Sequence, residues 1–172
     1  MEKELLKIEE TELKGVFLVN HINVDDDLYI KYDREIFYKN GLDLNFVQEN
    51  ESFSKKNVLR GLHIQPNKPQ GKLVDVVCGE IYDVVVDLRK ESNTYKKWQS
   101  FIISSDMHKS LYIPEGCAHG FFVKSEYAVI NFKVSNYWYP EDEIEIDWND
   151  DELKINWDIE DLKKVIMKKD EK

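Results

Sequence analysis

Short apolar runs rich in Val, Ile and aromatic residues occupy the centre of the chain, and polar or Gly/Pro turns separate them. Runs of this length and composition are typical of β-strands. They predict a hairpin within 72–88, broken at Cys78-Gly79-Glu80, and later strands at 98–104, 110–114, 119–125 and 127–139. The N-terminal segment 12–20 is predicted to join the same sheet.

Helical patterns are confined to the two ends of the chain. Residues 33–41 close on Asn40-Gly41, a helix stop, and residues 159–172 are predicted as a short helix or a fraying tail. We therefore expect one all-β domain over 1–172, a jelly-roll β-sandwich or barrel with short terminal helices. Long edge strands invite pairing, so a homodimer is expected.

Composition and charge exclude some partners. The net charge of -10 argues against binding to nucleic acid, although a local basic cluster still permits a small anionic ligand. No apolar stretch approaches the roughly 18 residues of a membrane span. The two cysteines, Cys78 and Cys117, are interpreted as reduced thiols, and the N-terminus lacks an apolar signal core. We expect a cytoplasmic protein without a membrane partner.

Two histidines lie on predicted strands that follow turns. In the segment 46–65, side chains two apart share a face, so Leu62 and Ile64 should point one way and His63 the other. In LYIPEGCAHGFFV, the turn at Pro114 and Gly116 leads into a strand that carries His119. Two such histidines indicate a metal site or a general base.

The pattern around His63 disfavours a metal. Metal sites in jelly-roll proteins use His-x-His and a nearby Glu, but Gln65 and Gln70 occupy those positions. We expect no metal. The alternative is proton abstraction by His63, with Lys72 or Arg60 stabilising the negative charge that develops.

Several long motifs in the same order resemble one family. NVLRGLHIQ, GKLVDVVCGEIYDVVVDLRKESNTY, SLYIPEGCAHGFFV and WNDDELKINW, within 13–157, look like the signatures of the dTDP-4-dehydrorhamnose 3,5-epimerases. The resemblance implies a cupin-type jelly roll, a homodimer, no cofactor or metal, and a nucleotide-diphosphate 4-keto sugar as substrate.

The resemblance also implies roles for individual residues. His63 corresponds to the catalytic base, Lys72 to the lysine at the enolate oxygen, Asp83 to an active-site aspartate and Asp170 to the partner of the histidine. The positions that resemble nucleotide, sugar and diphosphate contacts are Gln48, Glu49, Asn50, Arg60, His119, Glu143 and Lys169, besides Lys72.

Enolate chemistry explains these roles. Carbons 3 and 5 flank the C4 ketone, so a neutral imidazole can remove either hydrogen and an ammonium can stabilise the enolate. The implied activity is epimerisation at C3, C5 or both. The alternatives are a 3,4-ketoisomerase and a non-catalytic sugar-nucleotide-binding cupin.

The chain departs from the family at two places. Phe132 stands where the family carries a tyrosine that supplies the second proton, and a phenyl ring has no proton to give. Asp25, Asp26 and Asp27 stand in the stretch where the family has a diphosphate-binding arginine. Tyr137 or Tyr139 is a possible substitute acid, and Tyr137 and Trp138 either stack on a base or pack. Nucleotide and sugar remain open.

Overall fold

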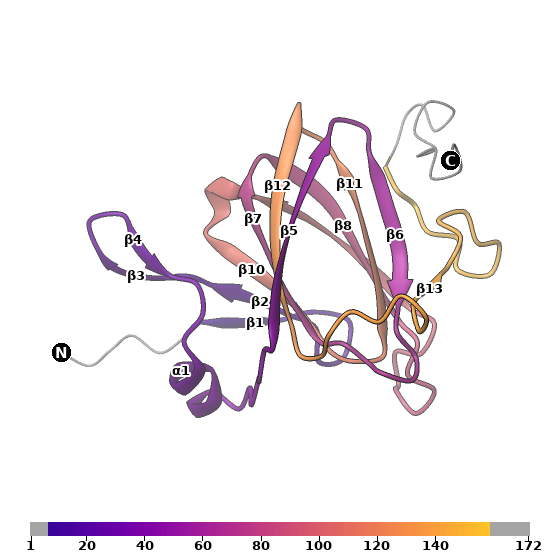
Figure 1. Cartoon of the computed structure of the whole chain (residues 1–172), viewed down its shortest axis with the longest axis horizontal. Helices are drawn as coiled ribbons and strands as arrows, with labels where there is room; N and C mark the ends of the chain where they lie inside the picture. Colours follow the sequence, from indigo (N-terminus) through magenta and orange to yellow (C-terminus); the bar gives the residue numbers. More distant parts are fainter. Residues whose placement is uncertain (1–6, 159–172) are drawn as a thin grey trace.

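The computed structural model describes residues 7–158, and its strands form two facing antiparallel sheets and a separate two-stranded hairpin (Figure 1). In the six-stranded sheet the order is β1 (Ile8–Glu10), β2 (Phe17–Asn20), β10 (Lys109–Ile113), β7 (Lys72–Cys78), β12 (Tyr127–Val134) and β5 (Gln48–Lys55). In the five-stranded sheet it is β13 (Ile144–Glu145), β6 (Leu59–Ile64), β11 (Cys117–Val123), β8 (Glu80–Asp87) and β9 (Trp98–Ser104). The all-β jelly-roll prediction is confirmed.

The main core lies between the two sheets. Alternate residues of β7 and β12 point inwards, so Val74 and Ile130 are fully buried. They meet Ile81 and Val85 of β8 and Ile103 of β9, which are also inaccessible to solvent. Each such side chain contributes about 1.5–3 kcal/mol by leaving water, and together they fix the separation of the sheets.

A second apolar cluster covers the outer face of the five-stranded sheet. Leu62 and Val84 pack there against Leu153 and Trp157 of the segment that follows β13, which runs beside β6 in Figure 1. The alternation predicted for β6 is confirmed, because Leu62 faces this cluster while His63 faces the space between the sheets.

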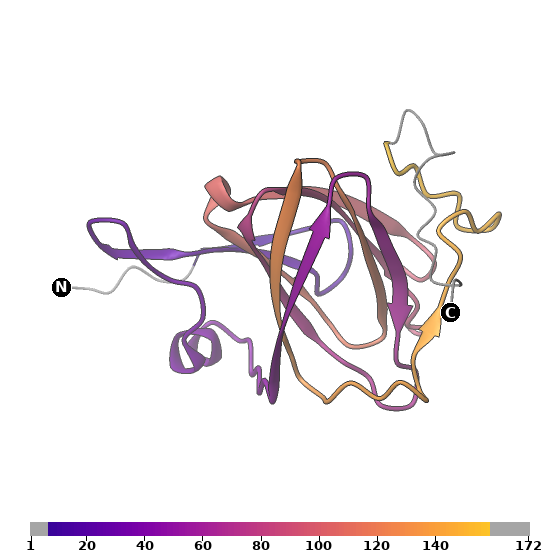
Figure 2. The same ribbon diagram turned by 45° about the horizontal axis from the view of Figure 1, so that its top comes forward.

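The six-stranded sheet is covered over only part of its outer face. The short helix α1 (Arg34–Lys39) brings Phe37 onto Val19 and Leu73. Its predicted ends are confirmed: the Asp33 carboxylate accepts a hydrogen bond from the Ile36 amide at 3.0 Å, and Asn40 is the C-cap. The hairpin of β3 (Ile22–Asp25) and β4 (Leu28–Ile30) projects from the body in both views (Figures 1 and 2).

The hairpin predicted for 72–88 is wrong. Two strands occur there, but β7 pairs with β10 and β12 in one sheet, and β8 pairs with β9 and β11 in the other. Gly79 lies between them at φ +86°, where a side chain would collide with the Tyr127 carbonyl oxygen. The chain therefore turns a corner from one sheet to the other, as a positive φ at glycine permits.

Other strand boundaries differ slightly from the predictions. Segment 12–20 is extended only from Phe17, because a turn closes beforehand with a hydrogen bond from Val16 N to Leu13 O. The strand expected at 127–139 ends at Val134. A 3-10 turn, η1 (Ser105–Met107), joins β9 to β10. Residues 7–158 contain no helix with the length and apolarity that a membrane crossing requires. The helix or tail expected at 159–172 lies outside the described residues.

Candidate active site

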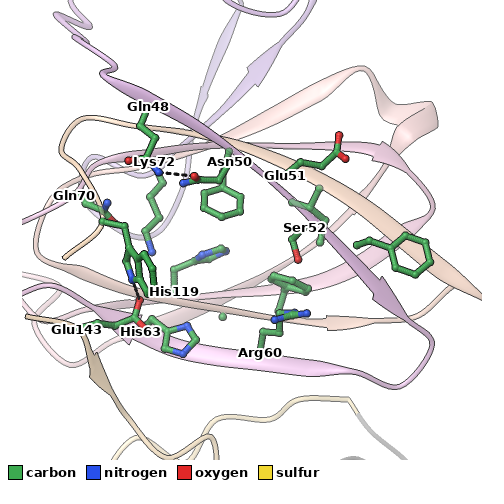
Figure 3. A pocket seen from close by; sticks show the side chains of 16 residues that line it. Gln48, Asn50, Glu51, Ser52, Arg60, His63, Gln70, Lys72, His119 and Glu143 are labelled. Carbon is green, nitrogen blue, oxygen red and sulfur yellow. Dashed lines mark hydrogen bonds between the residues drawn. The ribbon is translucent and has the colours of Figure 1, made fainter. Parts of the chain in front are cut away.

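A cavity of about 470 Å³ opens between the two sheets, beyond the end of the main core (Figure 3). One wall belongs to the six-stranded sheet and the other to the five-stranded sheet. The residues that line the cavity are Gln48, Asn50, Glu51, Ser52, Phe53, Arg60, His63, Gln70, Lys72, His119, Gly120, Phe121, Ile130, Phe132, Trp138 and Glu143. The cavity therefore collects most of the polar residues that the sequence singled out.

The two histidines are direct cross-strand neighbours in the five-stranded wall. His63 of β6 pairs with His119 of β11, so their side chains share the face that looks into the cavity. The strands approach closely here: a Cβ on Gly61 would lie 2.6 Å from the His119 carbonyl oxygen. A Cβ on Gly120 would lie 2.7 Å from the Arg60 carbonyl oxygen. Both positions need glycine for this approach.

A buried aspartate orients His119. The Nε2 atom of His119 lies 2.8 Å from Oδ2 of Asp83, whose side chain is fully buried on the neighbouring strand β8. Because the carboxylate accepts a hydrogen bond from Nε2–H, it fixes the orientation and the tautomer of the ring. Asp83 itself does not line the cavity, but its hydrogen bond holds the position of His119, which does.

Lys72 is the cation of the opposite wall. It comes from β7, and its side chain extends across the cavity towards the wall that carries the two histidines (Figure 3). Burial lowers the pKa of Lys72 below its ordinary value, while the negative charges of Glu143 and Asp83 act in the opposite direction. Burial is the larger effect, so this ammonium is a stronger acid than a solvated lysine.

The segment after β12 closes one end of the cavity. Trp138 donates a hydrogen bond from Nε1 to Oε2 of Glu143 at 3.0 Å, and both residues line the cavity. Gln65 holds this segment: its Nε2 donates to the Tyr137 carbonyl at 3.1 Å, and its Oε1 accepts from the Tyr139 amide at 2.9 Å. Gln65 occupies a position that carries a metal ligand in metal-binding jelly-roll proteins. Here its side chain holds the backbone of the segment after β12, so its role is structural.

Further polar groups lie along both walls of the cavity. Arg60 donates from Nε to Ser54 Oγ at 2.9 Å, which holds its guanidinium at the lining. On the opposite wall, Gln48 of the edge strand β5 donates a hydrogen bond to Asn50 Oδ1 at 2.6 Å. Glu51 lies beside them and is exposed. One guanidinium and two amides provide the kind of donors that a phosphate or a base edge accepts.

Not every residue singled out from the sequence reaches the cavity. Glu49 lies on the other face of β5 and pairs with Lys133 at 2.5 Å, as the two-residue period of a strand requires. Tyr137 is 54% exposed and does not line the cavity. Lys169 and Asp170 lie outside the described residues. Phe132 does line the cavity, from β12.

Sequence reasoning did not assign seven of the lining residues to the site, and these are Glu51, Ser52, Phe53, Gln70, Gly120, Phe121 and Ile130. Ser52 follows Gln48 and Asn50 at the same two-residue spacing, so alternation alone could have placed it on the wall. Ile130 has the same relation to Phe132. Gln70 and Phe121 carry no comparable local signal. Within 7–158, His, Cys, Asp and Glu side chains do not gather in groups of three that would hold a metal ion.

Comparison with known proteins identifies the family that this chain matches. The family described as dTDP-4-dehydrorhamnose 3,5-epimerase matches residues 10–172. A dTDP-4-dehydrorhamnose 3,5-epimerase from Methanothermobacter thermautotrophicus is 44% identical over 144 residues, which are 82% of this chain and 78% of that protein.

Solved structures agree with this match. The crystal structure of the enzyme of that name from Elizabethkingia anophelis has a TM-score of 0.86 and 38% identity, over 91% of this chain and 88% of that one. The 3,5-epimerase from Legionella pneumophila, in complex with dTDP-4-keto-L-rhamnose, has a TM-score of 0.84 and 36% identity, over 88% and 83%. The chain therefore belongs to the dTDP-4-dehydrorhamnose 3,5-epimerase family.

Proposed function

We propose that the protein is an isomerase that inverts C3, C5 or both in a dTDP-linked 4-keto-6-deoxy sugar. The observation that carries this function is the opposition of His63 and Lys72 across one cavity. A base on one wall and an ammonium on the other suit a substrate whose ring lies between them. The structural relative bound to dTDP-4-keto-L-rhamnose supports the choice of sugar and nucleotide.

The proposed reaction begins at His63. The imidazole removes the hydrogen from a carbon next to the C4 ketone, and the electron pair moves onto the ketone oxygen as an enolate. Lys72 faces that oxygen and stabilises a charge that exists only on the way to the enolate, which lowers the barrier rather than the energy of the bound substrate. Asp83 holds His119, which we assign to sugar binding beside the base.

We assign the diphosphate to the end of the cavity at Arg60, and contacts to the nucleotide to Gln48 and Asn50 along β5. Arg60 is the one guanidinium among the described lining residues, and it suits a phosphate oxygen. Trp138 and Glu143 close the sugar end. Glu49, paired with Lys133 on the outer face, is left out of this assignment, although the family resemblance includes it.

We infer a homodimer from the outer surface of the six-stranded sheet. Large apolar side chains are exposed on the projecting hairpin and on strands β5, β7 and β12, and these are Val24, Leu28, Phe53, Val77 and Tyr127. Exposed apolar side chains are costly in water, and a second copy that packs on these elements would bury them. Light scattering coupled to size exclusion tests this; a monomer mass at micromolar concentration would contradict it.

We further propose that the whole chain is one domain and that it works in the cytoplasm. A nucleotide-sugar substrate and the two free thiols, Cys78 and Cys117, support a reducing compartment. Fractionation of cells that produce the protein tests this, and recovery from an extracytoplasmic fraction would contradict it.

The decisive test is incubation with dTDP-4-keto-6-deoxyglucose in heavy water, followed by NMR. An epimerase introduces deuterium at C3 or C5 and yields a sugar whose configuration at that carbon is inverted. A 3,4-ketoisomerase would instead move the carbonyl to C3, and a non-catalytic binding protein would label no carbon. Either of those outcomes would contradict the proposed function.

A further inference from the structure

The two walls of the cavity differ in their titratable groups. The five-stranded wall carries His63, His119 and Arg60. Most of the lining residues that the six-stranded sheet contributes have no titratable group, and these are Gln48, Asn50, Ser52, Phe53, Ile130 and Phe132. Glu51 is exposed and Lys72 reaches inside, so Lys72 is the one titratable side chain of the described residues that this wall places within the cavity.

Inversion of a carbon requires proton transfer on both faces of the sugar ring. His63 removes a proton on the face that it contacts, and the new proton must arrive from the opposite face. That face meets the six-stranded wall, where Phe132 offers no exchangeable proton. Neither tyrosine that follows β12 lines the cavity: Tyr137 is exposed, and the Tyr139 ring lies 3.5 Å from the ammonium of Lys68.

We propose that Lys72 is the acid that delivers the second proton, in addition to stabilising the enolate. This inference rests on the proposed epimerase function and deepens it. It assigns to one ammonium the two tasks that the opposite wall must perform.

The position of Lys72 on its wall supports this role. In the pairing of β7 with β12, Phe132 lies opposite Val74 and Val134 lies opposite Lys72. Lys72 and Phe132 therefore face the same way, one diagonal step apart, a separation that a long side chain can span. Figure 3 shows the Lys72 side chain directed towards His119 and His63 from the far side of the cavity.

The surroundings of Lys72 suit proton donation. Burial lowers its pKa and so makes the ammonium a better acid, whereas the negative charges of Glu143 and Asp83 act against this shift and favour the protonated form. Glu143 itself is a weaker candidate for the donor. Its carboxylate accepts the Trp138 indole proton at 3.0 Å, and it belongs to the segment that closes the end of the cavity rather than to the opposite wall.

The proton balance of the step is complete. The C–H bond breaks as its proton passes to His63, and the electron pair enters the enolate. The enolate carbon then takes a proton from the Lys72 ammonium on the other face, and the C4 carbonyl forms again. Lys72 is left as a neutral amine and His63 as an imidazolium, and exchange with water restores both.

Lys72→Arg separates the two tasks. The guanidinium keeps the positive charge but does not give up a proton at the pH of the assay. The variant is compared with wild type, Phe132→Tyr and the double variant Lys72→Arg/Phe132→Tyr, all with dTDP-4-keto-6-deoxyglucose in heavy water. For each protein, NMR gives the rate at which deuterium enters unreacted substrate and the rate at which inverted sugar forms. Binding of dTDP, measured by calorimetry, verifies that the cavity is intact.

The expected result is a change in the ratio of the two rates. In Lys72→Arg, deuterium still enters unreacted substrate, but inversion falls by about 100-fold or more relative to that exchange. Adding Phe132→Tyr restores inversion, because a phenol then stands on the same wall. A loss of inversion no greater than the loss of exchange would overturn the proposal and leave Lys72 as an enolate stabiliser alone. Wild type without exchange or inversion would instead contradict the proposed function.

Discussion

Replacing Lys72 with methionine should make the protein more stable and much less active. The ammonium is enclosed between the sheets, and burial lowers its pKa, which means that the folded state disfavours the charge. Methionine keeps the length of the side chain and adapts to irregular space. Apolar side chains in place of buried charged groups are neutral or stabilising by about 1–4 kcal/mol where desolvation exceeds the Coulombic attraction, and the lowered pKa of Lys72 indicates that desolvation is the larger effect here. We expect the lower part of that range, because Glu143 and Asp83 partly compensate the charge.

A stabilisation of about 1–2 kcal/mol raises the melting temperature of a chain of this size by about 2–8 °C. Its dependence on pH follows from the direction of the pKa shift. Lys72 has a lower pKa folded than unfolded, so its penalty is fully present below the folded value and disappears as pH approaches the unfolded value of about 10.4. The advantage of Lys72→Met over wild type should therefore shrink as pH rises towards the unfolded pKa.

Urea unfolding at several pH values measures the stability, and the heavy-water assay measures the activity. Turnover should fall by about 100–1,000-fold, the usual cost of losing one charge-stabilising group. Lys56→Met is a matched control, since Lys56 pairs with Glu126 at the surface and should change stability by less than about 0.5 kcal/mol. A less stable Lys72→Met, or one whose advantage does not vary with pH, would show that attraction to the carboxylates outweighs desolvation.

Three further outcomes can be checked. His63→Asn should abolish deuterium exchange while circular dichroism stays unchanged; wild-type exchange rates would remove the residue from its role as base. Asp87→Asn should cost about 2–4 kcal/mol in urea unfolding, because the fully buried carboxylate accepts five hydrogen bonds, three from Arg89 and two from hydroxyls. Burial raises the Asp87 pKa, but these bonds outweigh it and lower the pKa well below its ordinary value, so the contribution is complete above pH of about 3.9 and declines gradually as pH falls towards the folded pKa; a loss as large at pH of about 2 as at pH of about 7 would contradict this account. A chain that ends at Lys164 should stay folded but lose most of its turnover; full activity would refute the part assigned to Asp170.

Local periodicity predicted what depends on neighbouring residues. The two-residue period of a strand predicted that His63 and Leu62 point to opposite faces of the sheet, and the Asn40-Gly41 pair predicted the end of α1. The same period explains why Glu49 departs from Gln48 and Asn50, which the family resemblance had grouped together. The strand was correctly located, but adjacent side chains on a strand point to opposite faces of the sheet.

Local patterns did not predict which strands pair with one another over long distances in the sequence. Both strands of 72–88 were predicted, yet nothing in an apolar run states which sheet it will join, and the corner at Gly79 resembles a hairpin turn in sequence. The contact between Asp83 and His119 depends on the register of β8 against β11, which joins residues 36 positions apart. Only the family resemblance suggested Asp83 in advance.

The close approach of β6 and β11 has a consequence for mutational scanning. Gly61 and Gly120 sit beside the two histidines, and a methyl group on either would meet backbone atoms of the facing strand. A comprehensive substitution library scored by growth should therefore reject changes at the glycines as strictly as changes at His63. The glycine variants would fail through loss of soluble protein, and the histidine variants through loss of chemistry. Intolerance to substitution alone will therefore not identify the reacting groups of this enzyme; abundance must be measured beside activity.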